Sequence, residues 1–372
     1  MSPAPASRTF QDAASRWAGV GPYYAMFPVA FADSIVREYT EPGDTVLDPF
    51  AGRGTAVFSA AAQDRSAVGV EINPVGYVYA RAKLRPARRS QVEGRLDDLG
   101  ELANGFEAEA EELPWFFHRC FSPGVRRFLL AARSELDWRR GRIDRTLMAL
   151  LLVYLHGKEG AALSNQMRQT KSMSPQYAVR WWDERSLDPP EIDPVAFIKS
   201  RLDWRYAKGV PDLTDGKVYL GDSKSVLRRL SRRIAAKKAQ RARLLFTSPP
   251  YYAVTNYHYD QWLRLWLLGG PPNALRTGGA RRGKFEHRED YRLLLLDVFK
   301  RAAQVLTPDA TVYVRTDHRQ FTHDTTVSVL EEVFPDKLLE RTARPFARPT
   351  QTSLFGDTST KKGEVDLVLR PA

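Results

Sequence analysis

The chain has 372 residues, of which 43% are hydrophobic and 27% charged, a composition typical of a soluble globular protein with a sizeable core. Its formal net charge of +12 favours a polyanionic partner, nucleic acid above all, although a basic composition without such a partner is the alternative. The single cysteine, Cys120, excludes an intrachain disulfide and suits a reducing compartment.

The N-terminal stretch lacks the basic start and the apolar run of a signal peptide. The longest apolar run, Leu147 to Leu155, is far shorter than the roughly 20 residues that span a bilayer, and it predicts a buried helix instead. We therefore expect a cytoplasmic protein without a membrane partner.

A β-loop-α-β pattern extends over residues 45–71. A strand over Thr45 to Leu47 is followed by a glycine-bearing loop and an alanine-rich helix, and a second strand over Ala67 to Val70 ends in Glu71. This pattern is typical of a parallel sheet with helices on its faces.

Helices are expected next, because no convincing strand occurs from about Gln91 to Gly216. Later strands are expected at 217–220, in the stretch RLLFTSPP, at 310–315, and in a hairpin formed by 336–344 and 364–372. The order predicts one α/β domain, residues 1–90 and 215–372, that is interrupted by a mostly helical insertion, residues 91–214.

The loop DPFAGRGTA follows the first strand with Gly52 and Gly54 spaced G-x-G. Glycines allow a ligand to approach the backbone, and the helix that follows offers free N–H groups. The dinucleotide fingerprint is incomplete, because Val57 stands at the third glycine position. Alone, this spacing also fits an ordinary structural turn.

Three carboxylates at strand ends make a ligand site more specific. Asp48 suits an ammonium group, as in the methionine part of S-adenosylmethionine, and Glu71 suits the two hydroxyls of a ribose. Asp222, which ends the stretch VYLGD, is the third such carboxylate and is a candidate to face the adenine. A capping aspartate and a solvated glutamate are the alternative explanation.

The stretch TSPPYY places Ser248, Pro249, Pro250 and Tyr251 at the end of a buried strand. An exocyclic base amine is a poor nucleophile, and two acceptors that hold its N–H bonds would aim its lone pair at a methyl group. The Ser248 hydroxyl and a carbonyl fixed by the prolines fit this role, and Tyr251 offers a face for stacking the base. A proline-rich turn is the alternative, and we expect only packing from Tyr252.

These motifs together resemble those of the site-specific DNA amino-methyltransferases, over roughly residues 20–90 and 215–372. The segment YYAMFP resembles the family's N-terminal cofactor motif, and DPFAGRGT its glycine motif, with Arg53 where the family often has serine. The resemblance implies catalysis by Ser248, Pro249, Pro250 and Tyr251. It implies binding of S-adenosylmethionine by Tyr24, Phe27, Pro28, Asp48, Pro49, Phe50, Gly52, Gly54, Thr55, Glu71, Ile72, Asp222 and Ser248.

The resemblance also implies a fold and a subclass. The fold is the Rossmann-like class I methyltransferase fold, with a mostly parallel seven-stranded sheet that ends in an antiparallel hairpin. Serine at the head of the Pro-Pro-Tyr motif resembles the cytosine-N4 branch, and adenine N6 stays open. The glycine motif precedes the Pro-Pro motif here, whereas the order is commonly reversed in cytosine-N4 enzymes.

Two other chemistries lack support. Methylation of cytosine carbon 5 needs a cysteine nucleophile, and Cys120 lies in the predicted insertion, where a small buried hydrophobe is its expected role. The six histidines are scattered, and His318 and His323 have no cysteine partners, so we expect no metal.

Basic and polar stretches indicate where DNA would bind. The helix over 223–243 and the loops over 276–288 and 343–353 are basic, and the insertion groups Asn165, Gln166, Arg168, Gln169 and Lys171, with Tyr177, Trp181 and Trp182 nearby. These three aromatic side chains are expected in the core of the insertion, with base stacking as the alternative, and a solvated face is the alternative for the helix. The candidates for DNA contact are Arg168, Lys171, Arg276, Arg281, Arg282, Lys284, Arg344 and Arg348.

The sequence therefore predicts a methyltransferase that flips a base out of double-stranded DNA and modifies its amine, preferably cytosine N4. A cognate restriction endonuclease is a possible partner of such an enzyme. The open alternatives are an adenine-N6 enzyme, an RNA amine methyltransferase, a dinucleotide oxidoreductase and a non-catalytic DNA-binding module.

Overall fold

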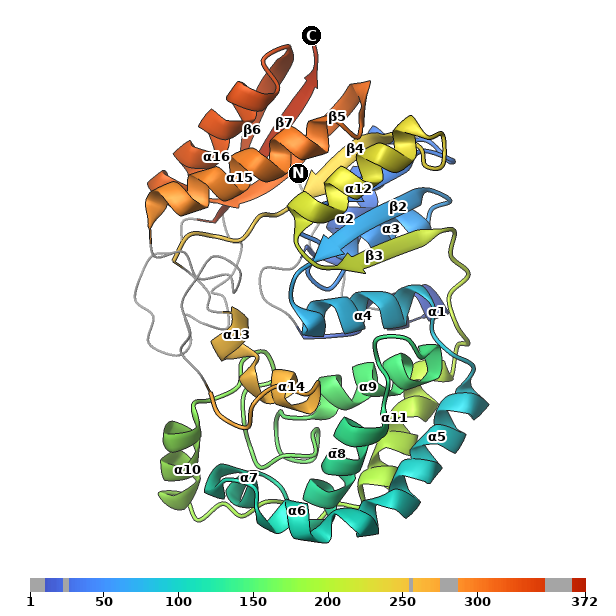
Figure 1. Cartoon of the computed structure of the whole chain (residues 1–372), viewed down its shortest axis with the longest axis vertical. Helices are drawn as coiled ribbons and strands as arrows, with labels where there is room; N and C mark the ends of the chain where they lie inside the picture. Colours follow the sequence, from blue (N-terminus) through green and yellow to red (C-terminus); the bar gives the residue numbers. More distant parts are fainter. Residues whose placement is uncertain (1–10, 23–26, 254–256, 275–286, 345–362) are drawn as a thin grey trace.

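A single seven-stranded sheet organises the upper part of the molecule (Figure 1). The computed structural model describes residues 11–22, 27–253, 257–274, 287–344 and 363–372. The strands are β1 (Thr45–Asp48), β2 (Ser66–Glu71), β3 (Gly216–Leu220), β4 (Ala242–Thr247), β5 (Leu306–Asp317), β6 (Lys337–Arg344) and β7 (Glu364–Pro371).

The strand order is β3-β2-β1-β4-β5-β7-β6, with β7 antiparallel to both of its neighbours and the other pairs parallel. This arrangement confirms the predicted mostly parallel sheet with a C-terminal hairpin. The order reverses at β1 and β4, whose carboxyl ends lie side by side, and open α/β sheets bind ligands at such a switch point.

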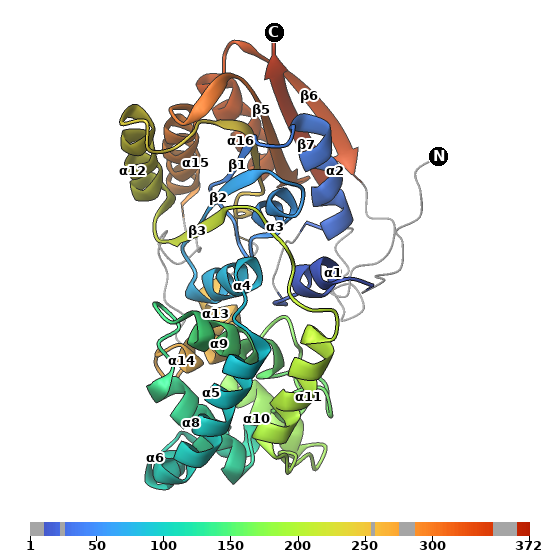
Figure 2. The same ribbon diagram turned by 90° about the vertical axis from the view of Figure 1, so that its right-hand side faces the viewer.

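Helices cover both faces of the sheet, which is why β1 is buried along its whole length. Figure 2 shows α12, α15 and α16 on one face and α2 and α3 on the other. The helices of this part are α1 (Ala13–Ala18), α2 (Val29–Tyr39), α3 (Thr55–Ala61), α4 (Pro74–Leu84), α12 (Ser223–Ala235), α15 (Arg288–Ala303) and α16 (Gln320–Val333).

Residues 85–215, all of which are described, form helices and no strand. The helices of this part are α5 (Arg89–Leu102), the 3₁₀ helix η1 (Ala103–Phe106), α6 (Glu107–Glu111), α7 (Trp115–Cys120), α8 (Pro123–Glu135), α9 (Arg142–Tyr154), α10 (Pro175–Asp183) and α11 (Pro194–Tyr206). The apolar run 147–155 lies mostly in α9 and is buried among them, as expected.

Two short helices from beyond the predicted insertion join this helical part. They are α13 (Tyr257–Asp260) and α14 (Trp262–Leu267), which follow β4 in the chain. The ring of Trp266 lies 4.5 Å from that of Phe117, and the ring of Trp262 lies 4.9 Å from that of Phe116. One hydrophobic cluster runs from the α2–α3 face of the sheet into these helices. No helix in the described ranges is long and apolar enough to cross a membrane.

Candidate active site

Asp48 ends β1 at the switch point of the sheet and is 2% exposed. Its carboxylate accepts hydrogen bonds from the Thr247 hydroxyl at 2.6 Å and from the backbone N–H of Phe50 at 3.1 Å. Burial raises the pKa of Asp48 to about 7, although these two hydrogen bonds lower it. Because Thr247 is the last residue of β4, this contact joins the ends of two neighbouring strands.

The loop after Asp48 requires its two glycines. Gly52 and Gly54 have φ values of 52° and 71°, in the left-handed region that favours glycine. A Cβ on Gly54 would lie 2.8 Å from the Cβ of Ala80 on α4, so a side chain there would force the loop away from the helix. Arg53 is buried and donates to the carbonyl of Gly21 at 3.0 Å, so this departure from the family pattern ties the loop to the N-terminal segment.

Glu71 ends β2 beside this loop and accepts a hydrogen bond from the backbone N–H of Asn73 at 2.6 Å. Burial raises the pKa of Glu71 to about 8, while backbone hydrogen bonds lower it. The next residue, Ile72, is 48% exposed and offers an apolar surface at the strand end. Asp222 is exposed and caps α12 by accepting from the N–H of Lys224 at 3.0 Å.

The Ser-Pro-Pro-Tyr segment follows β4 directly and is partly buried. The Ser248 hydroxyl lies 3.4 Å from the Tyr251 hydroxyl, which in turn donates to Glu364 Oε1 at 3.1 Å. Burial raises the pKa of Tyr251 well above its usual value, and the Glu364 carboxylate raises it further. Glu364 was not predicted from the sequence, because the stretch EVDLVLRPA indicates only that a strand is present.

Arg315, on β5, contacts Glu364 and Asp366 of the neighbouring strand β7. Its guanidinium binds both carboxylate oxygens of Asp366, at 2.6 and 3.0 Å, and lies 3.4 Å from Glu364 Oε2. It also lies 3.7 Å from the centre of the Phe31 ring. This arginine therefore holds the strand end that carries Glu364.

The two tyrosines of TSPPYY have different surroundings. Tyr252 packs edge-on against Phe321 at 4.8 Å and Tyr291 at 5.8 Å. These ring contacts are consistent with the packing role expected of Tyr252. In the N-terminal motif, Phe27 is buried and stacks on Phe246 at 4.4 Å, Pro28 caps α2, and Tyr24 lies outside the described residues.

Comparison with known proteins bears on the N-terminal part of the site. Residues 6–80 match a family model described as DNA methylase. The chain is 43% identical over 54 residues to the type II methyltransferase M.Cfr9I of Citrobacter freundii, and 37% identical over 65 residues to the type II methyltransferase M.XycI of Xanthomonas campestris pv. cyanopsidis. These matches cover 14% and 18% of this chain and 18% and 22% of the relatives.

The chain resembles the DNA amino-methyltransferases. It spans about a fifth of the length of the curated relatives that it matches. The solved structure of TrmN from Thermus thermophilus shares 11% identity with this chain at a TM-score of 0.37. The match covers 96% of this chain and 52% of that one.

The resemblance to DNA amino-methyltransferases implies S-adenosylmethionine as the methyl donor. The strand ends fit such a molecule, because Asp48 and Glu71 are buried carboxylates for which no ion-pair partner occurs within the described residues. The ammonium and ribose hydroxyls of the donor would supply the missing partners. Asp48, the glycine loop and Glu71 would hold it, and its sulfonium would provide a methyl group that an amine can attack.

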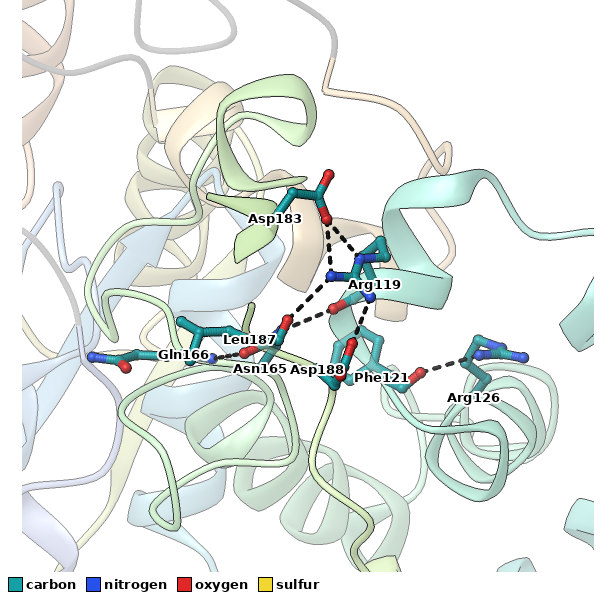
Figure 3. A network of polar contacts seen from close by, with 8 residues as sticks. All are labelled: Arg119, Phe121, Arg126, Asn165, Gln166, Asp183, Leu187 and Asp188. Carbon is teal, nitrogen blue, oxygen red and sulfur yellow. Dashed lines mark hydrogen bonds and ion pairs between the residues drawn. The ribbon is translucent and has the colours of Figure 1, made fainter. Parts of the chain in front are cut away.

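The predicted recognition residues of the helical part fall into two groups. Asn165 is buried and donates to the carbonyls of Arg119 at 3.1 Å and Leu187 at 2.9 Å, a network that Figure 3 shows. Trp182 is also buried, and its indole N–H donates to the carbonyl of Gln166 at 2.7 Å, as expected of a core residue. Tyr177 is 48% exposed on α10, so the core position expected of it is wrong. Gln166, Arg168 and Gln169 have exposed side chains.

The backbone of residues 166–173, which we call the 166–173 segment, is held by residues around it. Arg264 donates to the carbonyl of Gln169 at 2.5 Å, Gln261 to that of Thr170 at 3.2 Å, and Trp262 to that of Met173 at 3.0 Å. Lys171 forms an ion pair with Asp260 at 2.5 Å. The short helices α13 and α14 therefore fix this segment of the insertion.

His156 also contacts the 166–173 segment. Its Nδ1 lies 2.7 Å from the carbonyl of Arg168, and its Nε2 lies 3.2 Å from the Ser172 hydroxyl. Burial lowers the pKa of His156 well below its usual value, so the ring is neutral. A neutral ring can donate to the carbonyl through Nδ1 and accept from Ser172 through Nε2, which satisfies both contacts.

Other predicted DNA contacts are separated from the site or are not described. Arg276, Arg281, Arg282, Lys284 and Arg348 lie outside the described residues, and only the backbone of Arg344 is described, at the end of β6. Helix α12 begins after the carboxyl end of β3, beside the site, and runs back toward the amino end of β4. Its basic last turn therefore lies near the amino ends of the parallel strands, away from the site.

Cys120 is buried in α7, and burial raises the pKa of its thiol well above the usual value, in keeping with its expected role as a small hydrophobe. Within the described residues, no three His, Cys, Asp or Glu side chains are grouped closely enough to hold a metal ion.

Proposed function

We propose that this protein transfers a methyl group from S-adenosylmethionine to the exocyclic amine of a base in double-stranded DNA, with cytosine N4 as the preferred acceptor. The contact between Asp48 and Thr247, at 2.6 Å, carries the proposal. In this contact the end of β1 lies directly beside the end of β4, the strand that leads into Ser248. This supports the proposal that a donor held at Asp48 would meet the acceptor amine at one point.

Ser248 and the two prolines would prepare the amine for attack. The Ser248 hydroxyl and a carbonyl of the rigid Ser248–Pro250 segment would accept the two amine hydrogens, which directs the nitrogen lone pair toward the methyl group. Tyr251 would stack on the base. A base inside a duplex cannot reach this depth, so the reaction requires that the base be flipped out of the helix.

The choice of cytosine N4 follows from Ser248, and adenine N6 is the alternative. The test is incubation of the protein with duplex DNA and methyl-labelled donor, followed by mass spectrometry of the nucleosides. We expect N4-methylcytosine, and none from a Ser248→Ala variant. Finding N6-methyladenine alone would overturn the subclass. Methylation of folded RNA without methylation of DNA, or no methylation of either, would overturn the proposed function.

Within this function, we propose the 166–173 segment as the part that reads the target sequence. Its exposed Gln166, Arg168 and Gln169 are side-chain types that hydrogen-bond to base edges. The bonds from His156, Gln261, Trp262 and Arg264 fix its backbone, so little order would have to be gained on binding. Figure 1 shows α13, which holds the segment, between the sheet and the helical part.

The reading role can be separated from general DNA binding. Gln169→Ala should change the sequence preference by about 1–3 kcal/mol at one position of the site, measured as methylation of a library of randomised duplexes. Gln176→Ala is the matched control, because Gln176 is an exposed glutamine on the nearby helix α10. An unchanged preference in the Gln169 variant would place sequence reading elsewhere.

The relatives are named type II methyltransferases, and we propose that this protein likewise protects DNA from a companion endonuclease. DNA methylated by the protein should then resist cleavage by an extract of the cells in which the chain occurs, whereas unmethylated DNA is cut. Equal cutting of both DNA samples would remove the endonuclease from the proposal.

A further inference from the structure

Methylation of an amine leaves a surplus proton, and the site must remove it. When the amine nitrogen bonds to the methyl carbon, the carbon–sulfur bond breaks and its electron pair stays on sulfur. The nitrogen then carries two hydrogens and a positive charge, and it becomes neutral only by releasing one proton to an acceptor.

We infer that Glu364 is that acceptor, reached through the hydroxyls of Ser248 and Tyr251. This inference rests on the proposed function. The three oxygens form a chain with separations of 3.4 Å, between Ser248 and Tyr251, and 3.1 Å, between Tyr251 and Glu364. One proton would pass from the amine to Ser248 while the Ser248 proton passes to Tyr251 and the Tyr251 proton to Glu364.

The direction of this chain is set by chemistry. An ionised carboxylate only accepts hydrogen bonds, so the Tyr251 hydroxyl has to donate to Glu364. The Tyr251 oxygen is then left to accept the hydrogen of Ser248, and the lone pairs of the Ser248 oxygen are left for the amine. Glu364 thus makes Ser248 an acceptor, which is the role that the amine requires.

The surroundings of Glu364 suit a group that takes up one proton and releases it. Its side chain is 24% exposed, so a proton can leave to solvent. The charged groups around it are Arg315 and Asp317 on β5 and Asp366 on β7, and Arg344 is its backbone partner on β6. Burial raises the pKa of Glu364, while the Arg315 guanidinium lowers it, so the carboxyl titrates above its usual range.

The test is Glu364→Gln, measured in a single turnover with donor and DNA saturating at every pH. Glutamine can still accept from Tyr251 through its amide oxygen, but it cannot take the proton. We expect the rate to fall about a hundredfold or more. The wild-type rate should rise with pH as Glu364 ionises, and this rise should disappear in the variant. Glu364→Asp, which keeps a carboxylate, should be slower yet retain the rise.

Glu340→Gln is the matched control, because Glu340 is an exposed carboxylate on the neighbouring strand β6, and its rate should stay at the wild-type value. Calorimetry of donor and DNA binding, with thermal unfolding, shows whether each variant is folded; if Glu364→Gln does not fold, the pH profile of Glu364→Asp decides. A wild-type rate in Glu364→Gln, or an unchanged pH profile, would overturn the inference. A wild-type protein that methylates no DNA amine would instead overturn the proposed function.

Discussion

The two halves of the proposed site, one for the methyl donor and one for the acceptor base, are built differently. In the donor half, Asp48 and Glu71 belong to one β-loop-α-β unit, and each accepts from the backbone two residues further along the chain. In the acceptor half, Tyr251 and Glu364 are 113 residues apart and meet because β7 lies against β5. The donor half is therefore encoded locally, and the acceptor half depends on the assembled sheet.

Their electrostatics differ as well. Asp48 and Glu71 are buried without a described ion-pair partner, and burial raises both pKa values. Glu364 faces Arg315, which lowers its pKa against the effect of burial. The carboxylates of the donor half thus have no ion-pair partner within the described residues, whereas Glu364 of the acceptor half already has Arg315 as its counterion. Substitutions in one half should consequently affect donor binding, and those in the other half the chemical step.

The largest effect is expected from Tyr251→Phe. The variant keeps the ring for stacking but removes the hydroxyl that links Ser248 to Glu364. We expect the single-turnover rate to fall about a hundredfold or more, with donor affinity unchanged by calorimetry. Tyr252→Phe, in the neighbouring tyrosine that packs on Phe321, should change the rate only a few-fold. Equal losses in both variants would show that the hydroxyl of Tyr251 has no special role.

The next largest effect is expected where the two halves touch. Thr247→Val removes the hydroxyl that donates to Asp48, and a hydrogen bond to a charged group is worth about 1.5–3 kcal/mol. Donor affinity should fall about 10- to 100-fold by calorimetry, because the ionised form of Asp48 loses support. Thr316→Val, in a buried threonine on β5, should leave donor affinity unchanged. If both variants bind the donor normally, Asp48 does not contact it.

The same contrast decides what the sequence could reveal. Asp48, Glu71 and Ser248 were predictable because each follows an apolar strand directly, and the ends of parallel strands share one edge of the sheet. Glu364 was not, since its partner depends on the register in which β7 pairs with β5. Asn165 was predicted as a base reader but is buried, because the carbonyls of Arg119 and Leu187 need its amide, and no sequence pattern indicates which carbonyls lack partners.

A smaller effect concerns pH and the donor half. The pKa values of Asp48 and Glu71 are raised to about 7 and about 8, so both carboxyls bind protons that the unfolded chain releases at lower pH. The stability that this gives the ligand-free protein is lost as pH rises through these values. A donor that pairs with ionised Asp48 should bind about tenfold more tightly near pH 8 than near pH 6.

Thermal unfolding with and without S-adenosylhomocysteine, which keeps the ammonium group, measures this effect at about pH 6, 7 and 8. The increase in melting temperature on adding the ligand should grow with pH in the wild type and stay level in Asp48→Asn. A ligand effect that is the same at every pH in the wild type would mean that Asp48 does not titrate on binding.

The smallest effect should come from Arg315→Lys in the acceptor half. Lysine keeps the charge but cannot hold both oxygens of Asp366 while it lies near Glu364. The pKa of Glu364 should then rise, because the guanidinium that lowers it is weakened, and the rising limb of the single-turnover rate should move to higher pH. The loss should be a few-fold near neutral pH and should vanish in alkaline buffer.

Arg370→Lys, in an exposed arginine on β7, is the control. A loss of equal size at every pH would mean that Arg315 only supports the strand and does not tune the acceptor, and the two halves would then differ in construction but not in electrostatics.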